Sequence, residues 1–120
     1  MRYLLMIYSE DSYYETLGEE GMAKLMEGYG KFTEELIAAG AMQDSARLQP
    51  VQTATTVRIR QGRVSNTDGP FAETKETIGG YYLIDVADLD AALSWAQKLP
   101  TASYGSIEVR PVWEMEEEGG

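Results

Sequence analysis

The chain has 120 residues and a formal net charge of −10, from 20 acidic and 10 basic side chains, and 43% of its residues are hydrophobic. This length supports one domain with a real hydrophobic core, and the acidic balance argues against nucleic acid and anionic membranes as partners, because both attract cationic proteins. Cysteine and histidine are both absent, which excludes disulfides, thiolate or imidazole metal ligands, and catalytic pairs of serine or cysteine with histidine.

Hydrophobic periodicity predicts a strand, a long helix and a second strand in the N-terminal half. The expected elements are a strand over Arg2–Tyr8, a polar loop over Ser9–Tyr14, a helix from about Gly18 to Ala39 and an irregular strand over Met42–Leu48. The helix should end at Gly40, because glycine is the common residue at that position. Its apolar residues recur at helical spacing and are Met22, Leu25, Met26, Tyr29, Phe32, Leu36 and Ile37.

The C-terminal half of the sequence predicts a hairpin, a further strand, a helix and a last strand. The expected elements are hairpin strands over Thr53–Arg60 and Arg63–Thr67, a strand over Ile78–Val86, a helix from Asp88 through Leu99 and a strand over Ile107–Val112. Gln61-Gly62 is a two-residue turn signal, and Asp88 is a favourable N-cap. The buried stripe of the second helix should comprise Leu89, Ala92, Leu93, Ala96 and Leu99.

Two of the predicted strands are apolar on both faces. The first strand has Tyr3, Leu5 and Ile7 on one face and Leu4, Met6 and Tyr8 on the other; the later strand has Ile78, Tyr82, Ile84 and Val86 against Tyr81, Leu83 and Asp85. A sheet covered on one side alternates apolar with polar residues, and two helices can cover only one face. We therefore expect a two-fold homodimer in which the sheets pack face to face. Coverage by long loops of the same chain is the alternative.

The segment Asp68–Val86 carries the most specific motif, DGPF followed by AETKE and then GGYYLIDV. Asp, Gly and Pro in succession predict a tight turn, and paired glycines at the start of a strand predict a bulge or a close approach of two backbones. Together with RYLLMIYSE at 2–10, ADLDAALSWAQKLP at 87–100 and SIEVRPVWEM at 106–115, these motifs resemble the DGPF branch of the YCII-related proteins over nearly the whole chain.

The resemblance implies a fold and an assembly but no particular activity. It implies one α+β domain over residues 1–115, with a ferredoxin-like antiparallel sheet and two helices on one face, that pairs as a dimeric α+β barrel. Residues 116–120 should form a frayed acidic tail. YCII-related enzymes outside the DGPF branch use a histidine with an aspartate in the cleft. This chain has no histidine, so that role does not carry over.

Three acids and one lysine lie within nine residues, namely Asp68, Glu73, Lys75 and Glu76. In one interpretation Asp68 and Glu73 form a general acid–base pair and Lys75 holds an anionic substrate; in another, the carboxylates bind a hard cation. The structural alternative is a solvated turn with surface ion pairs. The spacing matches no known metal loop, and we expect neither a metal nor a cofactor.

Arginines and aromatic residues supply candidates for ligand binding. Arg47, Arg58, Arg60 and Arg63 lie within 17 residues, and guanidinium groups bind carboxylate or phosphate through paired hydrogen bonds. The alternative is that three of them solvate one face of the hairpin, opposite Val57 and Ile59. The tyrosines should line either a cleft that stacks a planar ligand or a dimer interface. The candidate ligand-binding residues are Tyr8, Arg58, Arg60, Phe71, Glu76 and Tyr82.

We therefore expect a cytoplasmic homodimer that binds a small anionic or aromatic molecule or serves as an accessory module. The alternative is a small enzyme with lyase-like or hydrolase-like acid–base chemistry on an organic acid or aromatic compound. An enzyme should enclose Asp68 or Glu73 in a pocket and shift the pKa of at least one of them. A binding module should leave both carboxylates in water.

Overall fold

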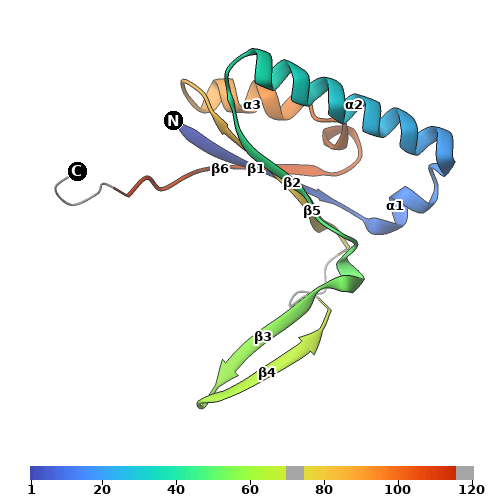
Figure 1. Ribbon diagram of the computed structural model, residues 1–120, viewed down its shortest axis with the longest axis vertical. Helices are drawn as coiled ribbons and strands as arrows, with labels where there is room; N and C mark the ends of the chain where they lie inside the picture. The colour runs from blue at the N-terminus through green and yellow to red at the C-terminus, as the bar shows by residue number, and fades with distance from the viewer. Residues whose placement is uncertain (70–74, 116–120) are drawn as a thin grey trace.

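The computed structural model describes residues 1–69 and 75–115. They form an α+β body from which a β-hairpin projects (Figure 1). The body contains β1 (Arg2–Ser9), α1 (Asp11–Glu15), α2 (Gly18–Ala38), β2 (Met42–Arg47), β5 (Thr77–Asp85), α3 (Leu89–Gln97) and β6 (Ser106–Pro111), with 3₁₀ turns η1 (Val51–Thr53) and η2 (Pro100–Ser103). None of the described helices is both long and apolar enough to span a membrane.

The body has the strand order of a ferredoxin-like fold. Its four strands are antiparallel neighbours in the order β2-β5-β1-β6. Two strand–helix–strand halves, β1–α2–β2 and β5–α3–β6, place α2 and α3 on the same face of this sheet (Figure 1). The hairpin is inserted between the two halves. The predicted α+β class and antiparallel sheet are confirmed.

The hydrophobic core lies between the helices and one face of the sheet. From β1 the side chains of Tyr3, Leu5 and Ile7 are at most 7% exposed, as are Tyr82 and Ile84 from β5. The helices and the segments that follow them contribute Phe32, Leu36, Ala41, Ala92, Ala96 and Leu99. Every second residue of both strands is therefore buried, which is the period expected of a sheet packed on one side.

The opposite face of the sheet has no described helix over it (Figure 1). Leu4, Met6 and Tyr8 alternate with the buried residues of β1, and each is half-buried. Their antiparallel neighbours on β5 include Tyr81 and Leu83, which are also half-buried. The predicted division of the β1 side chains between two apolar faces is confirmed, and we call these five residues the open face.

Local signals end α2 and start α3 as predicted. Gly40 has a φ of +73°, and its N–H donates to the carbonyl of Ile37 at 2.9 Å, while the N–H of Ala41 donates to the carbonyl of Leu36 at 3.1 Å. This pair of hydrogen bonds is the Schellman motif, which satisfies carbonyls at the end of a helix. At α3, the Asp88 carboxylate accepts a hydrogen bond from the N–H of Ala91 at 2.9 Å, as an N-cap does.

The paired glycines of β5 form both features that the sequence predicts. The register against β1 shifts where Ile7 pairs with Gly80 and Tyr8 pairs with Ile78, so Gly79 is the extra residue of a bulge. A Cβ atom on Gly80 would lie 2.7 Å from the carbonyl oxygen of Ala46 on β2, a contact that only glycine avoids.

Several expectations about side-chain faces were wrong. The bulge moves Ile78 onto the face of Tyr8, away from Tyr82 and Ile84, and leaves it 38% exposed. On α3, Leu89 and Leu93 are 48% and 39% exposed, because the helix turns its small residues toward the sheet and Trp95 packs against the core instead. Ile37 lies in the last turn of α2 and is 60% exposed.

The segment expected as a polar loop contains the short helix α1. The carboxylate of Asp11 accepts a hydrogen bond from the N–H of Val51 at 3.1 Å. The hydroxyls of Tyr14 and Ser9 are 2.7 Å apart, and the ring of Tyr13 stacks on that of Tyr104 with centroids 3.9 Å apart. These long-range contacts stabilise a turn of helix that has no strong local signal.

The hairpin consists of β3 (Thr55–Arg60) and β4 (Arg63–Asp68). Its turn residues Gln61 and Gly62 have φ values of 53° and 76°. Positive φ at both central positions is the geometry of a type I′ turn, whose twist matches that of paired strands. The predicted two-residue turn is therefore confirmed.

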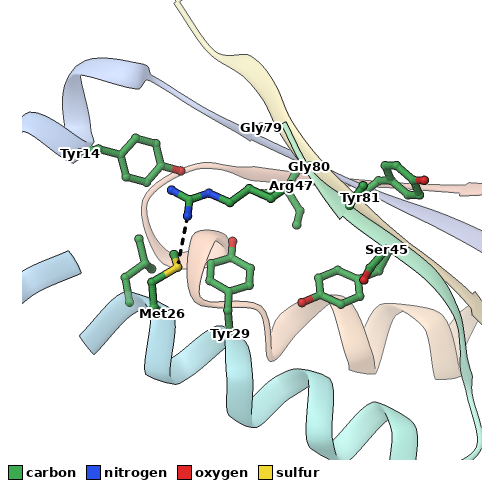
Figure 2. A pocket seen from close by; sticks show the side chains of 12 residues that line it. Tyr14, Met26, Tyr29, Ser45, Arg47, Gly79, Gly80 and Tyr81 are labelled. Atoms are coloured by element: carbon green, nitrogen blue, oxygen red, sulfur yellow. Dashed lines mark hydrogen bonds between the residues drawn. The ribbon is translucent and has the colours of Figure 1, made fainter. Parts of the chain in front are cut away.

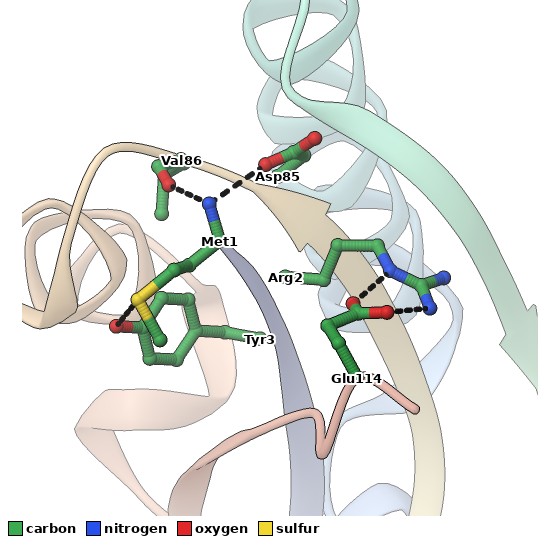
Figure 3. A network of polar contacts seen from close by, with 6 residues as sticks. All are labelled: Met1, Arg2, Tyr3, Asp85, Val86 and Glu114. Atoms are coloured by element: carbon green, nitrogen blue, oxygen red, sulfur yellow. Dashed lines mark hydrogen bonds and ion pairs between the residues drawn. The ribbon is translucent and has the colours of Figure 1, made fainter. Parts of the chain in front are cut away.

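Polar contacts close the end of the sheet at the start of β1 (Figure 3). The amino group of Met1 donates to the Asp85 carboxylate at 3.1 Å and to the carbonyl of Val86 at 2.8 Å. Arg2 donates two hydrogen bonds to Glu114, at 2.5 and 2.9 Å, and this contact lowers the pKa of the Glu114 carboxyl. The ladder continues past β6, because the N–H of Val112 donates to the carbonyl of Arg2 at 2.9 Å.

Candidate functional site

A cleft lies between α2 and the sheet, at the end of β2 and the start of β5 (Figure 2). Its volume is about 320 Å³, which is at the small end of the range for ligand pockets. The lining includes apolar Ile7, Leu25 and Met26, the tyrosines Tyr14, Tyr29, Tyr81 and Tyr82, polar Ser45 and Arg47, and the small residues Ala46, Gly79 and Gly80. The described lining is therefore mostly apolar and aromatic, with one cationic group.

Arg47 is the last residue of β2, and its side chain extends across the cleft toward α2 (Figure 2). Its guanidinium donates to the sulfur of Met26 at 3.4 Å, which is a weak acceptor. Among the described residues, no carboxylate lies within 4.0 Å of this guanidinium. Four of its five N–H donors thus have no hydrogen-bond partner within the described part of the chain.

Hydrogen bonds between hydroxyl groups hold the tyrosines that surround the cleft. The Tyr82 hydroxyl is 2.7 Å from that of Thr33, and Thr33 also donates to the carbonyl of Tyr29 at 2.9 Å. Tyr29 bonds through its hydroxyl to the fully buried Thr101, which is 3.2 Å from the hydroxyl of Tyr104. The phenol rings are therefore held in fixed orientations before any ligand arrives.

The same surroundings keep two of these phenols protonated. Burial raises the pKa of Tyr29, and burial together with a hydrogen bond that the Tyr104 hydroxyl donates to Tyr14 raises the pKa of Tyr104. A phenol with a raised pKa is a hydrogen-bond donor at neutral pH and a poor general base. The described lining residues include no carboxylate, so the chemistry that this cleft offers is apolar contact, hydrogen-bond donation and one positive charge.

The two glycines at the start of β5 differ in the space around them. A Cβ atom on Gly79 would meet no other atom within 4 Å, whereas one on Gly80 would collide with the backbone of β2. Both glycines line the cleft, so its wall has no side chain at either position.

Of the predicted site residues that the structure describes, only Tyr82 lines the cleft. Tyr8 lies on the open face, Arg58 and Arg60 on the hairpin, and Asp68 is exposed at the end of β4. Lys75 and Glu76 are exposed just before β5. Phe71 and Glu73 lie outside the described residues. The structure therefore does not gather the predicted acid–base set around the described cleft, and its catalytic role stays a prediction.

The sequence interpretation identified the lining only in part. It considered Arg47 for anion binding together with the hairpin arginines, although Arg47 lies on a different strand, and it assigned Tyr29 to the core stripe of a helix. One signal in the sequence could have identified them. A strand that ends in arginine and pairs with two glycines has few side chains at that end, so the arginine lies beside an unfilled space next to the preceding helix.

Comparison with known proteins identifies the family of the chain. An uncharacterised protein of Rhizobium meliloti (strain 1021) is 40% identical over 114 residues, which cover 93% of this chain and 92% of that protein. The profile of the YCII-related domain matches residues 1–116, and the chain therefore belongs to the YCII-related family.

Proposed function

We propose that the chain is a small-molecule-binding module whose cleft holds a small aromatic carboxylate, with Arg47 as the anchor of the carboxylate. The observation that carries this proposal is the contact of Arg47. Among the described residues that line the cleft, Arg47 is the one cation, and its hydrogen-bond partner there is the Met26 thioether. A ligand carboxylate that took the place of the Met26 sulfur would accept two charge-assisted hydrogen bonds from the Arg47 guanidinium.

The tyrosines of the lining favour a ligand that contains an aromatic ring. Tyr14, Tyr29 and Tyr82 line a cavity of about 320 Å³, and aromatic rings favour offset or edge contacts with another ring. This volume suits a single substituted ring better than a nucleotide or a dinucleotide. The phenol hydroxyl groups can donate hydrogen bonds to a substituent on that ring.

Binding is favoured over catalysis by the chemistry of the lining. Among the described residues around the cleft there is no carboxylate, and the sequence supplies no histidine. Asp68 is exposed on the hairpin, whereas the enzyme hypothesis requires that Asp68 or Glu73 be enclosed, and Glu73 lies outside the described residues. The acid–base enzyme therefore remains the alternative, and an observation in its favour would be turnover that depends on Asp68 or Glu73.

We also propose a two-fold homodimer that packs the open faces of two sheets together. This rests on the half-buried apolar residues Leu4, Met6 and Leu83, which no described helix covers. Burial of such a patch contributes about 25 cal/mol per Å² before the cost of association. The cleft lies on the helix side of the sheet, and Tyr81, whose side chain is on the open face, contributes to both surfaces.

The carboxylate proposal is tested by calorimetric titration with benzoate and its neutral analogue benzamide. We expect benzoate to bind more tightly to the wild-type chain, and Arg47→Gln to reduce its affinity about tenfold or more, since charge-assisted hydrogen bonds contribute roughly 1.5–3 kcal/mol. Benzamide affinity should change little. The matched control is Arg63→Gln, which removes the same charge from the hairpin and should leave benzoate binding unchanged.

A second variant tests the location of the ligand independently of charge. Gly79→Val adds a side chain where the wall of the cleft is open, and it should weaken benzoate and benzamide together. Equal benzoate affinity in the wild-type, Arg47→Gln and Gly79→Val chains would exclude this cleft as the binding site.

A further inference from the structure

The hairpin is amphipathic, with aliphatic side chains on one face and arginines on the other. The pairing of β3 with β4 puts Ile59 opposite Val64 and Arg60 opposite Arg63, and residues paired in this way share a face. Val57 lies on the aliphatic face and Arg58 on the basic face. Val57, Ile59 and Val64 are between 61% and 64% exposed.

The described chain provides no cover for either face of the hairpin. It extends from the body on the side of the sheet away from α2 and α3 (Figure 1). In the described residues, none of its three arginines forms an ion pair with a carboxylate. An isolated two-stranded ribbon is marginally stable in water, so a hairpin with three exposed aliphatic residues needs a partner surface.

The charge of the hairpin differs in sign from that of the rest of the chain. Residues 55–68 contain three arginines and one aspartate, a net charge of +2, whereas the whole chain carries −10 and the remainder therefore −12. Long-range attraction favours contact between oppositely charged surfaces. A second copy of the same chain presents the complementary charge.

We propose that residues 55–68 form an arm that clasps a second copy of the chain. The aliphatic face packs on the partner, and Arg58, Arg60 and Arg63 lie beside its acidic side chains. This inference rests on the proposed homodimer, because the arm extends on the side of the sheet where the open face would meet its partner (Figure 1). In that arrangement each arm passes alongside the other subunit instead of entering solvent.

Hydrogen exchange and sedimentation test the arm separately from the sheet interface. The wild-type chain is compared with Ile59→Thr/Val64→Thr and with Arg58→Glu/Arg60→Glu. Since these side chains are exposed, the fold of the body should be unaffected. We expect each double variant to weaken dimerisation about tenfold or more, and the charge reversal to remove most of the salt dependence of dimerisation.

The control is Lys24→Glu/Lys31→Glu, which makes the same charge change on exposed positions of α2 and should alter the dimerisation constant less than twofold. Amide exchange in residues 55–68 should slow as protein concentration rises through the dimerisation range. If the amides of residues 55–68 exchange as fast in the dimer as in the monomer, the proposal that the arm contacts the partner is wrong. The proposed dimer through the open faces would not be affected by that result. A wild-type chain that stays monomeric would overturn both, while benzoate binding would still test the cleft.

Discussion

Gly79 and Gly80 are adjacent residues of one bulge, but a side chain would meet different surroundings at each. At Gly80 a Cβ atom would lie 2.7 Å from the carbonyl oxygen of Ala46, and at Gly79 it would meet nothing within 4 Å. We therefore predict that Gly80→Ala lowers the free energy of unfolding by about 1–3 kcal/mol, because two paired strands would have to separate. Urea denaturation measures this difference.

The matched control for this prediction is Gly79→Ala. Its Cβ atom has space and its φ lies outside the positive range, so the free energy of unfolding should stay within about 0.5 kcal/mol or rise slightly through lower entropy of the unfolded chain. Equal losses of stability in the two alanine variants would contradict the proposed close approach of β5 to β2.

Buried tyrosine hydroxyls make stability sensitive to alkaline pH. Burial raises the pKa of Tyr29 and of Tyr104 above the ordinary 10.0. Above about pH 10, unfolded tyrosines lose protons that the folded chain retains. The stabilising contribution is thus fully present below pH 10 and is lost as pH rises toward the raised pKa values.

We predict that Tyr104→Phe loses less stability than the wild-type chain between about pH 9 and pH 11, because it removes one such group and keeps the ring stacked on Tyr13. Denaturant midpoints across this pH range measure the effect. If the denaturation midpoints of the two chains fall equally with pH, Tyr104 has the same pKa in the folded and unfolded states, and the prediction is wrong.

Much of the residue-level pattern could be predicted from alternation along the strands. Tyr3, Leu5 and Ile7 face the helices because a strand has a period of two residues. Ile78 could not be assigned in this way, because one extra residue in the bulge reverses the face of every residue before it. The sequence indicated a bulge but not which residue would be unpaired.

At the scale of an element, the start of α3 depends on Asp88, whose carboxylate accepts from the N–H of Ala91. We predict that Asp88→Ala lowers the free energy of unfolding by about 1 kcal/mol and that Asp88→Ser retains most of it, because serine also caps helices. Thermal unfolding of the three chains measures the change. Asp90→Ala, in the same first turn, should cost a few tenths of a kcal/mol at most.

Element boundaries followed from capping and periodicity where local signals are strong, as at Gly40 and Asp88. They failed for α1, because its five residues are held by contacts with Val51, Ser9 and Tyr104. The buried stripe of the second helix was correct for Ala92, Ala96 and Leu99 and wrong for Leu89 and Leu93. Leu89 and Leu93 fit a helical stripe, but close packing of the helix on the sheet places Ala92 and Ala96 at the contact.

At the scale of the whole molecule, the proposed dimer makes stability depend on protein concentration. We predict that the midpoint of denaturation rises with concentration for the wild-type chain. The rise should vanish for Leu83→Arg, which puts a charge into the centre of the open face. Light scattering should report a dimer for the first chain and a monomer for the second.

A control for this prediction is Leu93→Arg, which puts the same charge on an exposed position of α3. It should leave both the molecular mass and the concentration dependence unchanged. A wild-type midpoint that is independent of concentration, together with a monomeric mass, would contradict the sheet interface.

The fold was predictable to a greater extent than the site. The order of strands and helices follows from periodicities in the sequence, whereas the cleft combines α2, β2 and β5, which are separated along the chain. The motif segment pointed to this region only in part. Its Gly-Gly-Tyr-Tyr portion lines the cleft, and its Asp68 lies exposed on the hairpin.

The missing side chain at position 79 also makes this wall adjustable. Alanine, valine and leucine at this point would narrow the cavity in steps, starting from open space rather than from packed atoms. In the proposed complex with an aromatic carboxylate, the size of residue 79 would limit the ring that fits, and Arg47 would still bind the carboxylate.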